Sequence, residues 1–377
     1  MMMNRVEFLW KSFASFNMLK VLSLSVMLAF VACESDDDPL DVLEDKGDFV
    51  NGVFVLNQGL MGAANASVSF ISEDTVMGDL FTERNDVEVL GDVLQDMVSI
   101  DTLSFLVLNS SNSLMVVNNK NFEFVGEITE GISNPRYAEI YNGLIYVSQW
   151  GNNGEVVVVD PEQMKVVDTI GLGVGPEGMA VIGDELWVAN CGGYATDNTI
   201  SVIDLNNNEV IEEITVKDNP QDLVIDGNDD VWVLATGYTQ YDENWNEIGS
   251  TASGIQKINA STYEVEETFL TDETVYGKAT KIAMDVDGQS FYFGGGFGFP
   301  GVWKMAVDAS ELPGETFADV SANGLSVNPA NGDLYIGIAP SFEVTGSVEV
   351  YSSNGNKVTE YEDNIGIGPC NFLFVSE

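Results

Sequence analysis

The sequence contains no histidine among its 377 residues. Histidine is the usual base of Ser-His-Asp and Cys-His nucleophiles and a common zinc ligand, so the sequence excludes these catalytic and metal sites. Cationic side chains are also scarce, because 14 Lys and Arg residues stand against 60 Asp and Glu residues, for a formal charge of −46. A chain this acidic repels phosphate backbones, which argues against nucleic acid as a partner.

Cysteine is nearly absent, with only Cys33, Cys191 and Cys370 in the chain. Two cysteines as far apart as Cys191 and Cys370 make neither a disulfide framework nor a metal site, although a single disulfide between them is open in an exported protein. We expect no metal and no cofactor. The chain is 45% hydrophobic and long enough to bury a large core, so disorder of the whole chain is not expected.

The N-terminal region has a leader pattern. Residues 18–33 read MLKVLSLSVMLAFVAC, a short basic start and an apolar run that ends in small residues before a cysteine. Such a run is short for a bilayer span and typical of a secretory signal. The segment resembles a bacterial lipoprotein signal peptide with Phe30-Val31-Ala32-Cys33 as its lipobox. We therefore interpret residues 1–33 as a signal peptide that ends at a lipidated Cys33; a plain signal peptide or a buried helix is the alternative.

An acidic segment follows directly, beginning Glu34-Ser35-Asp36-Asp37-Asp38. Its composition predicts a solvated tether over residues 34–48. A serine followed by acidic residues after the lipid cysteine resembles the surface-export signal of Bacteroidetes lipoproteins, although a plain charged spacer would look similar. The resemblance implies an outer-membrane lipoprotein that is held to the membrane by its lipid anchor only and faces the cell exterior.

Residues 49–377 are built from a repeat. Apolar anchors at Leu94, Pro135, Pro176, Pro220, Ala279, Ala322 and Pro369 are separated by 41, 41, 44, 59, 43 and 47 residues. Each unit holds four short apolar or alternating segments separated by turn residues, as in GEVVVVDPEQMKVVDTI at residues 154–170. A period of 40–50 residues with four strands per unit is the signature of a β-propeller.

The number of units predicts an all-β, seven-bladed propeller of four-stranded antiparallel blades. The first unit has strands near residues 53–56, 66–71 and 87–90 but no inner strand of its own, so the C-terminal strand at 371–375 is expected to complete it and close the ring. The third and fourth strands of the repeat resemble those of YncE-like seven-bladed propellers. Fold alone says little about chemistry, because propellers have many functions.

One face of such a propeller holds the loops between second and third strands, and here these loops combine aromatic rings with Gly, Asn and Gln. The sequence QWGNN at 149–153 is an example in which a simple turn would have sufficed. Rings displace water, amides exchange hydrogen bonds and glycine allows close approach, so we predict a ligand-binding face. Its candidate residues are Gln58, Asn109, Gln149, Trp150, Asn152, Asn190, Tyr194, Tyr238, Trp245, Phe297, Phe299 and Phe342.

The starts of the inner strands are expected to surround the axis inside these loops. They place seven pairs of residues there: Gln95/Asp96, Arg136/Tyr137, Glu177/Gly178, Gln221/Asp222, Thr280/Lys281, Asn323/Gly324 and Cys370/Asn371. From these we add Arg136, Gln221, Lys281 and Asn371 to the ligand-binding residues. The alternative is that the aromatic side chains pack between blades as ordinary core. The insertion at 238–245 is expected to be a mobile lid.

Three classes of function remain after these exclusions. Glu177 and Asp222 could face each other as a catalytic acid and base or as calcium ligands of a lactonase-like site, although solvated charges are the simpler interpretation. The acidic turn 226–230 lacks the calcium-loop spacing and is interpreted as a hairpin turn. A propeller face could also bind proteins, as an adhesion platform or scaffold. We expect no catalytic residues.

The third class is ligand capture. The leader, length and repeat type resemble the cobalamin-capturing surface lipoproteins of gut Bacteroidetes, the BtuG type. The resemblance implies capture of a small ligand, cobalamin or another corrinoid, and its transfer to a TonB-dependent outer-membrane transporter. No binding motif of that group is present to assign residue by residue. A corrinoid carries many amides, which the aromatic, Asn and Gln side chains of the loops would suit.

Overall fold

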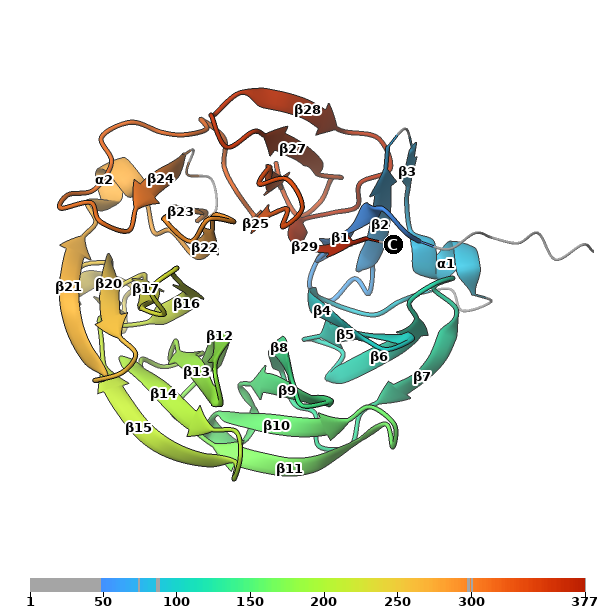
Figure 1. The fold of residues 1–377 in the computed structure, drawn as a ribbon, viewed down its shortest axis with the longest axis horizontal. Helices are drawn as coiled ribbons and strands as arrows, with labels where there is room; N and C mark the ends of the chain where they lie inside the picture. The colour runs from blue at the N-terminus through green and yellow to red at the C-terminus, as the bar shows by residue number, and fades with distance from the viewer. Residues whose placement is uncertain (1–48, 74, 86–88, 297–298, 300, 377) are drawn as a thin grey trace, which may run out of the picture. The chain divides into compact units, whose positions relative to one another are not determined.

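A computed structural model describes residues 49–73, 75–85, 89–296, 299 and 301–376. The predicted leader with Cys33 and the tether lie outside these residues, as does Phe297. Within the described part, seven antiparallel sheets are arranged around a central axis as the blades of a propeller (Figure 1). The predicted fold class is confirmed.

We number the blades along the chain and give their strands from the axis outward. Blade 1 contains β29 (Pro369–Val375), β1 (Gly52–Asn57), β2 (Ser67–Ser72) and β3 (Thr75–Met77). Blade 2 contains β4 (Leu94–Ile100), β5 (Leu103–Leu108), β6 (Ser113–Asn118) and β7 (Phe124–Ile128). Blade 3 contains β8 (Pro135–Tyr141), β9 (Leu144–Gln149), β10 (Glu155–Asp160) and β11 (Lys165–Gly171). Blade 4 contains β12 (Pro176–Ile182), β13 (Glu185–Asn190), β14 (Thr199–Asp204) and β15 (Glu209–Thr215).

The remaining blades include the two irregular ones. Blade 5 contains β16 (Pro220–Ile225), β17 (Val231–Ala235), β20 (Gly254–Asn259) and β21 (Glu264–Leu270), with the hairpin β18 (Thr239–Tyr241) and β19 (Glu247–Ser250) inserted. Blade 6 contains β22 (Lys281–Met284), β23 (Ser290–Gly294) and β24 (Val302–Ala306). Blade 7 contains β25 (Gly324–Val327), β26 (Leu334–Ile338), β27 (Ser347–Tyr351) and β28 (Lys357–Tyr361). The helices are short: α1 (Leu80–Arg84), α2 (Glu273–Tyr276) and the 3-10 turn η1 (Gly151–Asn153).

The two ends of the described chain meet in blade 1. Strand β29 pairs antiparallel with β1, with Val53 opposite Phe374 and Val55 opposite Phe372. The C-terminal strand is therefore the innermost strand of the first blade, as the sequence predicts. This pairing closes the ring and leaves no inner strand edge exposed at the junction.

Burial within a blade follows the distance from the axis. Central strands such as β10 are buried on both faces because neighbouring blades cover them, and a run of four valines at 156–159 is suited to that position. Outer strands such as β15 are almost entirely exposed, which matches their charged sequence. Between blades, apolar side chains form separate clusters; one joins Trp187 and Ala189 of blade 4 to Leu223 and Val233 of blade 5.

Two details differ from the sequence-based expectations. The third strand of blade 1 is β3 at residues 75–77, and the described part of the predicted strand at 87–90 is not in a sheet. The chain leaves the sheet early because α1 buries Leu80 and Phe81 in the cluster between blades 1 and 2. Blade 6 has three strands among the described residues, and a single bridge between Val302 and Ala318 marks the fourth position.

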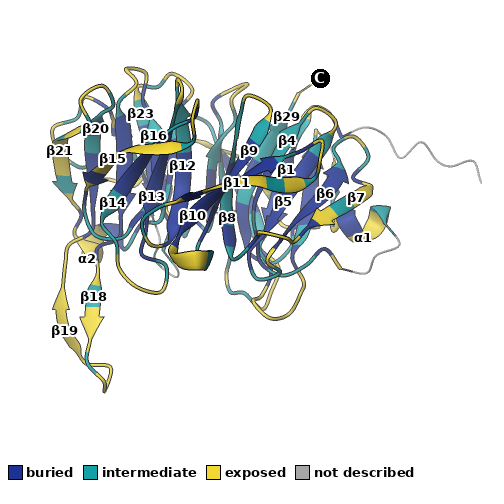
Figure 2. Cartoon of the chain, turned by 90° about the horizontal axis from the view of Figure 1, so that it is seen from below, coloured by how far each residue is buried: buried dark blue, intermediate teal, exposed yellow. Residues whose placement is uncertain are grey.

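The insertion of blade 5 is not a lid in this structure. Its two strands pair with each other, with Thr239 opposite Ser250, and the hairpin extends away from the ring (Figure 2). Asp242 organises its turn by accepting hydrogen bonds from the backbone N–H groups of Asn244 and Asn246. Local turn hydrogen bonds of this kind form the hairpin without help from the rest of the blade.

The acidic turn 226–230 is a hairpin turn, as predicted. The Asp226 carboxylate accepts hydrogen bonds from the backbone N–H groups of Asn228 and Asp230 and from Nε1 of Trp232. Its oxygens are therefore occupied by donors of the turn itself and of the strand that follows.

Candidate functional site

The inner strands enclose two cavities, one above the other along the axis. The first, of about 290 Å³, lies on the face of the loops between second and third strands, and we call it the funnel cavity. The second, of about 400 Å³, lies further along the inner strands, and we call it the lower cavity. Tyr137, Lys281 and Cys370 line both, so these residues form the boundary between them.

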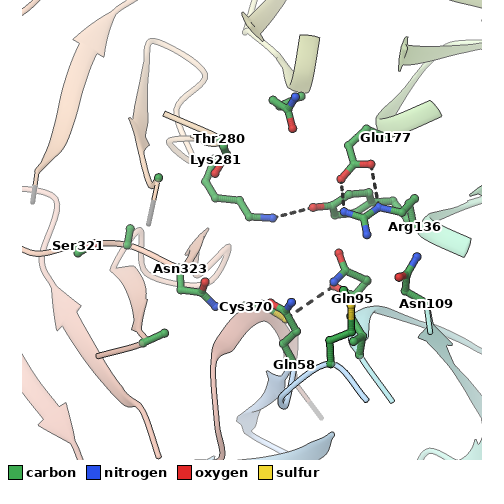
Figure 3. A pocket seen from close by; sticks show the side chains of 17 residues that line it. Gln58, Gln95, Asn109, Arg136, Glu177, Thr280, Lys281, Ser321, Asn323 and Cys370 are labelled. Atoms are coloured by element: carbon green, nitrogen blue, oxygen red, sulfur yellow. Dashed lines mark hydrogen bonds and ion pairs between the residues drawn. The ribbon is translucent and has the colours of Figure 1, made fainter. Parts of the chain in front are cut away.

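A hydrogen bond spans the channel at this boundary. Lys281 Nζ on β22 of blade 6 lies 2.6 Å from the Tyr137 hydroxyl on β8 of blade 3, on the opposite side of the ring (Figure 3). Burial raises the pKa of Tyr137 to about 12, so it is a neutral phenol at pH 7. Burial alone would lower the pKa of Lys281, but Tyr137 and the Asp222 carboxylate outweigh it and raise that pKa. The boundary is thus a stable ammonium–phenol contact.

The starts of the inner strands line the funnel cavity as the sequence predicts. One residue of each predicted pair is present: Gln95, Arg136, Glu177, Gln221, Thr280, Asn323 and Cys370. With Gln58 and Asn109, they give the cavity five amide side chains (Figure 3). Among the described residues, the side chains of Gln58 and Gln95 have no hydrogen-bond partner, so their amides are available to a ligand as donors and acceptors.

Arg136 and Glu177 form the only salt bridge among the described residues that line the funnel cavity. Arg136 Nε donates to Glu177 Oε2 at 2.8 Å and Nη2 donates to Oε1 at 2.5 Å. Burial disfavours the guanidinium charge, but Glu177 more than offsets this and raises the pKa of Arg136. A bidentate pair of this kind fixes both side chains.

Trp150 completes this pair and explains the tryptophan in the QWGNN loop. Its Nε1 donates to Glu177 Oε2 at 2.9 Å, and the Arg136 guanidinium carbon lies 4.5 Å from the ring centroid. Tyr194 of blade 4 meets the indole edge-on, with ring centroids 5.3 Å apart. The indole therefore joins blades 3 and 4 and supports Arg136 on one side and Tyr194 on the other.

The lower cavity has a different lining, with three carboxylates among apolar side chains. Asp96 accepts hydrogen bonds from the backbone N–H groups of Met97 and Ala138 and from Asn371 Nδ2. Burial nevertheless raises the pKa of Asp96 and of Asp222 to about 6. Burial, with the charges of Asp96 and Asp222, raises the pKa of Glu139 to about 8. Met97, Met179 and Met284 supply part of the apolar wall.

The predicted ligand-binding residues fall into separate groups. Gln58, Asn109, Arg136, Gln221 and Lys281 line the funnel cavity, whereas Asn371 lines the lower cavity. Gln149 and Asn190 have no exposed surface: Gln149 bonds to Gly131 O and Glu155, and Asn190 Nδ2 bonds to Thr199 and Ser201. Asn152 is exposed and donates to Glu155. These three amides support their own loops.

The predicted aromatic side chains do not line the funnel cavity. Tyr194 and Trp245 are 90% and 82% exposed, and Tyr238 and Trp245 belong to the projecting insertion. Phe299 packs against the core cluster of blades 5 and 6, and Phe342 lies beside Gly368. The reason is geometric: these loops start one strand further from the axis than the inner strands, and neighbouring strands are roughly 5 Å apart. Among the described residues, Tyr137 is the one aromatic side chain that lines the cavity.

Several funnel residues were absent from the predicted binding set although the sequence located them. Gln95, Glu177, Thr280 and Asn323 stand in the predicted pairs, and the signal was their place at the start of a repeat. The cysteines are both free and buried, so they do not pair. Glu177 and Asp222, considered together above, line different cavities. Across the described residues, no group of three or more Cys, Asp and Glu side chains is arranged to hold a metal ion.

The fold and the cavities define a seven-bladed β-propeller with a ligand-sized, amide-lined cavity on its axis. The chain belongs to a protein family described as a domain of unknown function, DUF5074, whose model matches residues 51–374. No curated protein matches the chain. Among the described residues, no helix is long and apolar enough to cross a membrane.

Solved structures with the same architecture come from several bacteria. A candidate 6-phosphogluconolactonase from Bacteroides fragilis has a TM-score of 0.64 and 12% identity, over 86% of this chain and 98% of that one. A quinoprotein alcohol dehydrogenase-like protein from Bacteroides thetaiotaomicron has a TM-score of 0.59 and 14% identity, over 87% and 79%. Hydrazine synthase from Kuenenia stuttgartiensis has a TM-score of 0.56 and 16% identity, over 80% and 92%. At such identities the similarity shows the fold alone.

Proposed function

We propose that this protein captures a small ligand in the funnel cavity, without catalysing a reaction, and delivers it to a TonB-dependent outer-membrane transporter. The ligand that we propose is cobalamin or another corrinoid. The observation that supports capture is the ring of amides around the funnel cavity, with Gln58 and Gln95 unpartnered among the described residues. Free amides in a concave site are suited to a ligand that carries many hydrogen-bonding groups.

The size of the cavity limits how such a ligand would bind. About 290 Å³ is at the low end of the roughly 300–1,000 Å³ that is usual for small-molecule sites. A corrinoid would therefore insert only one edge among the amides and rest its ring on the surrounding loops. Tyr194, exposed beside Trp150, is in position to contact that ring.

Cyanocobalamin retention tests the proposal directly. The purified protein is mixed with cyanocobalamin, desalted, and examined by visible spectroscopy for retained corrin absorbance. We expect retention by the wild type and at least a tenfold loss of affinity in a Gln58→Ala/Gln95→Ala variant, since two unpartnered amides are removed. Glu213→Gln, on an exposed outer strand, is the matched control and should bind normally. A colourless wild-type protein would exclude cobalamin.

The location belongs to the same proposal. The lipobox-like sequence at 30–33 and the acidic segment after it support a lipid-anchored protein on the cell surface, in the manner of YncE-like and BtuG-type lipoproteins of Bacteroidetes. Replacing Cys33 by alanine should then move the protein from the membrane fraction to the soluble fraction. An unchanged distribution would contradict the lipid anchor.

The projecting hairpin favours a second candidate, protein binding. Tyr241, Trp245 and Ile248 are 51%, 82% and 59% exposed, and clustered exposed aromatic residues are typical of protein interfaces. If the protein is an adhesion platform, shortening residues 239–250 to a tight turn should abolish binding to its partner and leave the funnel cavity unchanged. Cyanocobalamin binding by the shortened variant separates the two functions.

A further inference from the structure

We propose that the funnel cavity selects ligands that present neutral hydrogen-bond acceptors, such as amide carbonyls and hydroxyls, and that Glu177 is the specificity-determining residue that excludes carboxylates. This inference rests on the proposed capture of a ligand in the funnel cavity. It concerns which chemical class of ligand that site accepts.

The first step is that the Arg136 charge already has its counter-ion. Glu177 takes two of the N–H groups of Arg136 in a bidentate pair, and its side chain is only 6% exposed. Trp150 donates to the same carboxylate, so Glu177 cannot turn away to admit a ligand anion without losing that bond as well. A guanidinium has five N–H groups, and the remaining ones are free to donate into the cavity that Arg136 lines.

The second step is that Lys281 also has negative charge beside it. It forms the boundary of the lower cavity together with Asp96 and Asp222, and its charge acts to lower the pKa of both carboxyl groups. The ammonium also donates to Tyr137. An anion that reached Lys281 from the funnel cavity would meet the field of these carboxylates from below.

The third step is the environment of the two cations. The other polar groups that line the funnel cavity are amides and hydroxyls, which carry no charge. The formal charge of −46 repels anions from the whole molecule. The cavity therefore offers N–H donors without an uncompensated positive charge, which favours a neutral acceptor over a carboxylate.

The test compares a neutral ligand with its acid. Cyanocobalamin and its peripheral monocarboxylic acids, each with one amide hydrolysed, are titrated one by one into wild type, Glu177→Gln and the control Glu213→Gln. Wild type and control should prefer the amide. In Glu177→Gln the Arg136 charge is released, so the preference should fall by roughly tenfold for the acid whose carboxylate reaches Arg136. An unchanged preference for every acid would overturn the proposal.

Two further measurements keep this result separate from cobalamin binding and from misfolding. The NMR resonance of the Arg136 Nε–H group is titrated with acetate; it should shift saturably in Glu177→Gln and stay unchanged in wild type. Arg136→Gln/Glu177→Gln should fold and lose the acetate response. If no cobalamin compound binds, the proposed ligand is wrong and the acetate titration decides this inference; equal responses in wild type and Glu177→Gln, or none in Glu177→Gln, refute it.

Discussion

The funnel cavity and the lower cavity lie on one axis and are lined by the same inner strands, yet their chemistry differs. The funnel cavity has amides and a closed ion pair, whereas the lower cavity has three carboxylates with raised pKa values among methionines. Neighbouring residues supply the two: Gln221 lines one and Asp222 the other, and the same holds for Gln95 and Asp96. A displacement of one residue along an inner strand therefore decides which chemistry a side chain joins.

Breaking the ion pair should have the largest effect on this contrast. Glu177→Ala leaves Arg136 buried without its counter-ion and frees the Trp150 N–H, so we expect a loss of about 3–5 kcal/mol in the free energy of unfolding. Urea denaturation followed by circular dichroism measures it. Glu213→Ala, on the exposed β15 strand, should change the stability by less than about 0.5 kcal/mol. Equal effects of the two substitutions would show that the pair contributes nothing special.

The lower cavity should respond to pH in a way that the funnel cavity does not. The pKa of Glu139 is raised from 4.5 to about 8, so the folded protein holds its proton over a range in which the unfolded chain has lost it. Stability from this group is complete below pH 4.5 and is lost as the pH rises to about 8.

Glu139→Gln tests this sign, because glutamine stays neutral throughout. The variant and the wild type should be equally stable near pH 4, and the variant should become more stable by about 1–3 kcal/mol near pH 8. Urea midpoints measured across this range give the difference curve. A flat difference curve would mean that Glu139 is ordinarily solvated, and the contrast between the cavities would then rest on Asp96 and Asp222 alone.

The thiols give the smallest expected effect. Burial raises the pKa values of Cys191 and Cys370 to about 12, so both stay protonated and unreactive in the folded protein. Peptide mapping after maleimide treatment at pH 8 should find neither modified, and both modified in urea. Modification of folded Cys370, which lines both cavities, would show that the channel opens at the Tyr137–Lys281 contact.

The repeat pattern predicted the fold more closely than it predicted the site. The anchors Leu94, Pro135, Pro176, Pro220 and Pro369 are the first residues of inner strands in the structure. The site prediction favoured conspicuous aromatic loops, whereas the cavity is lined mainly by amides at less conspicuous strand starts. Composition shows where a loop is unusual, but it does not show how far from the axis that loop lies.

The sequence by itself determined the repeat, the number of blades, the closure by the C-terminal strand and the residues that surround the axis. These depend on strand periodicity and turn residues, which are local. Only the tertiary structure decided that Glu177 pairs with Arg136 and Trp150, and that Lys281 meets Tyr137 across the channel. Such contacts join residues from different blades, and their formation depends on the ring geometry that brings those blades together.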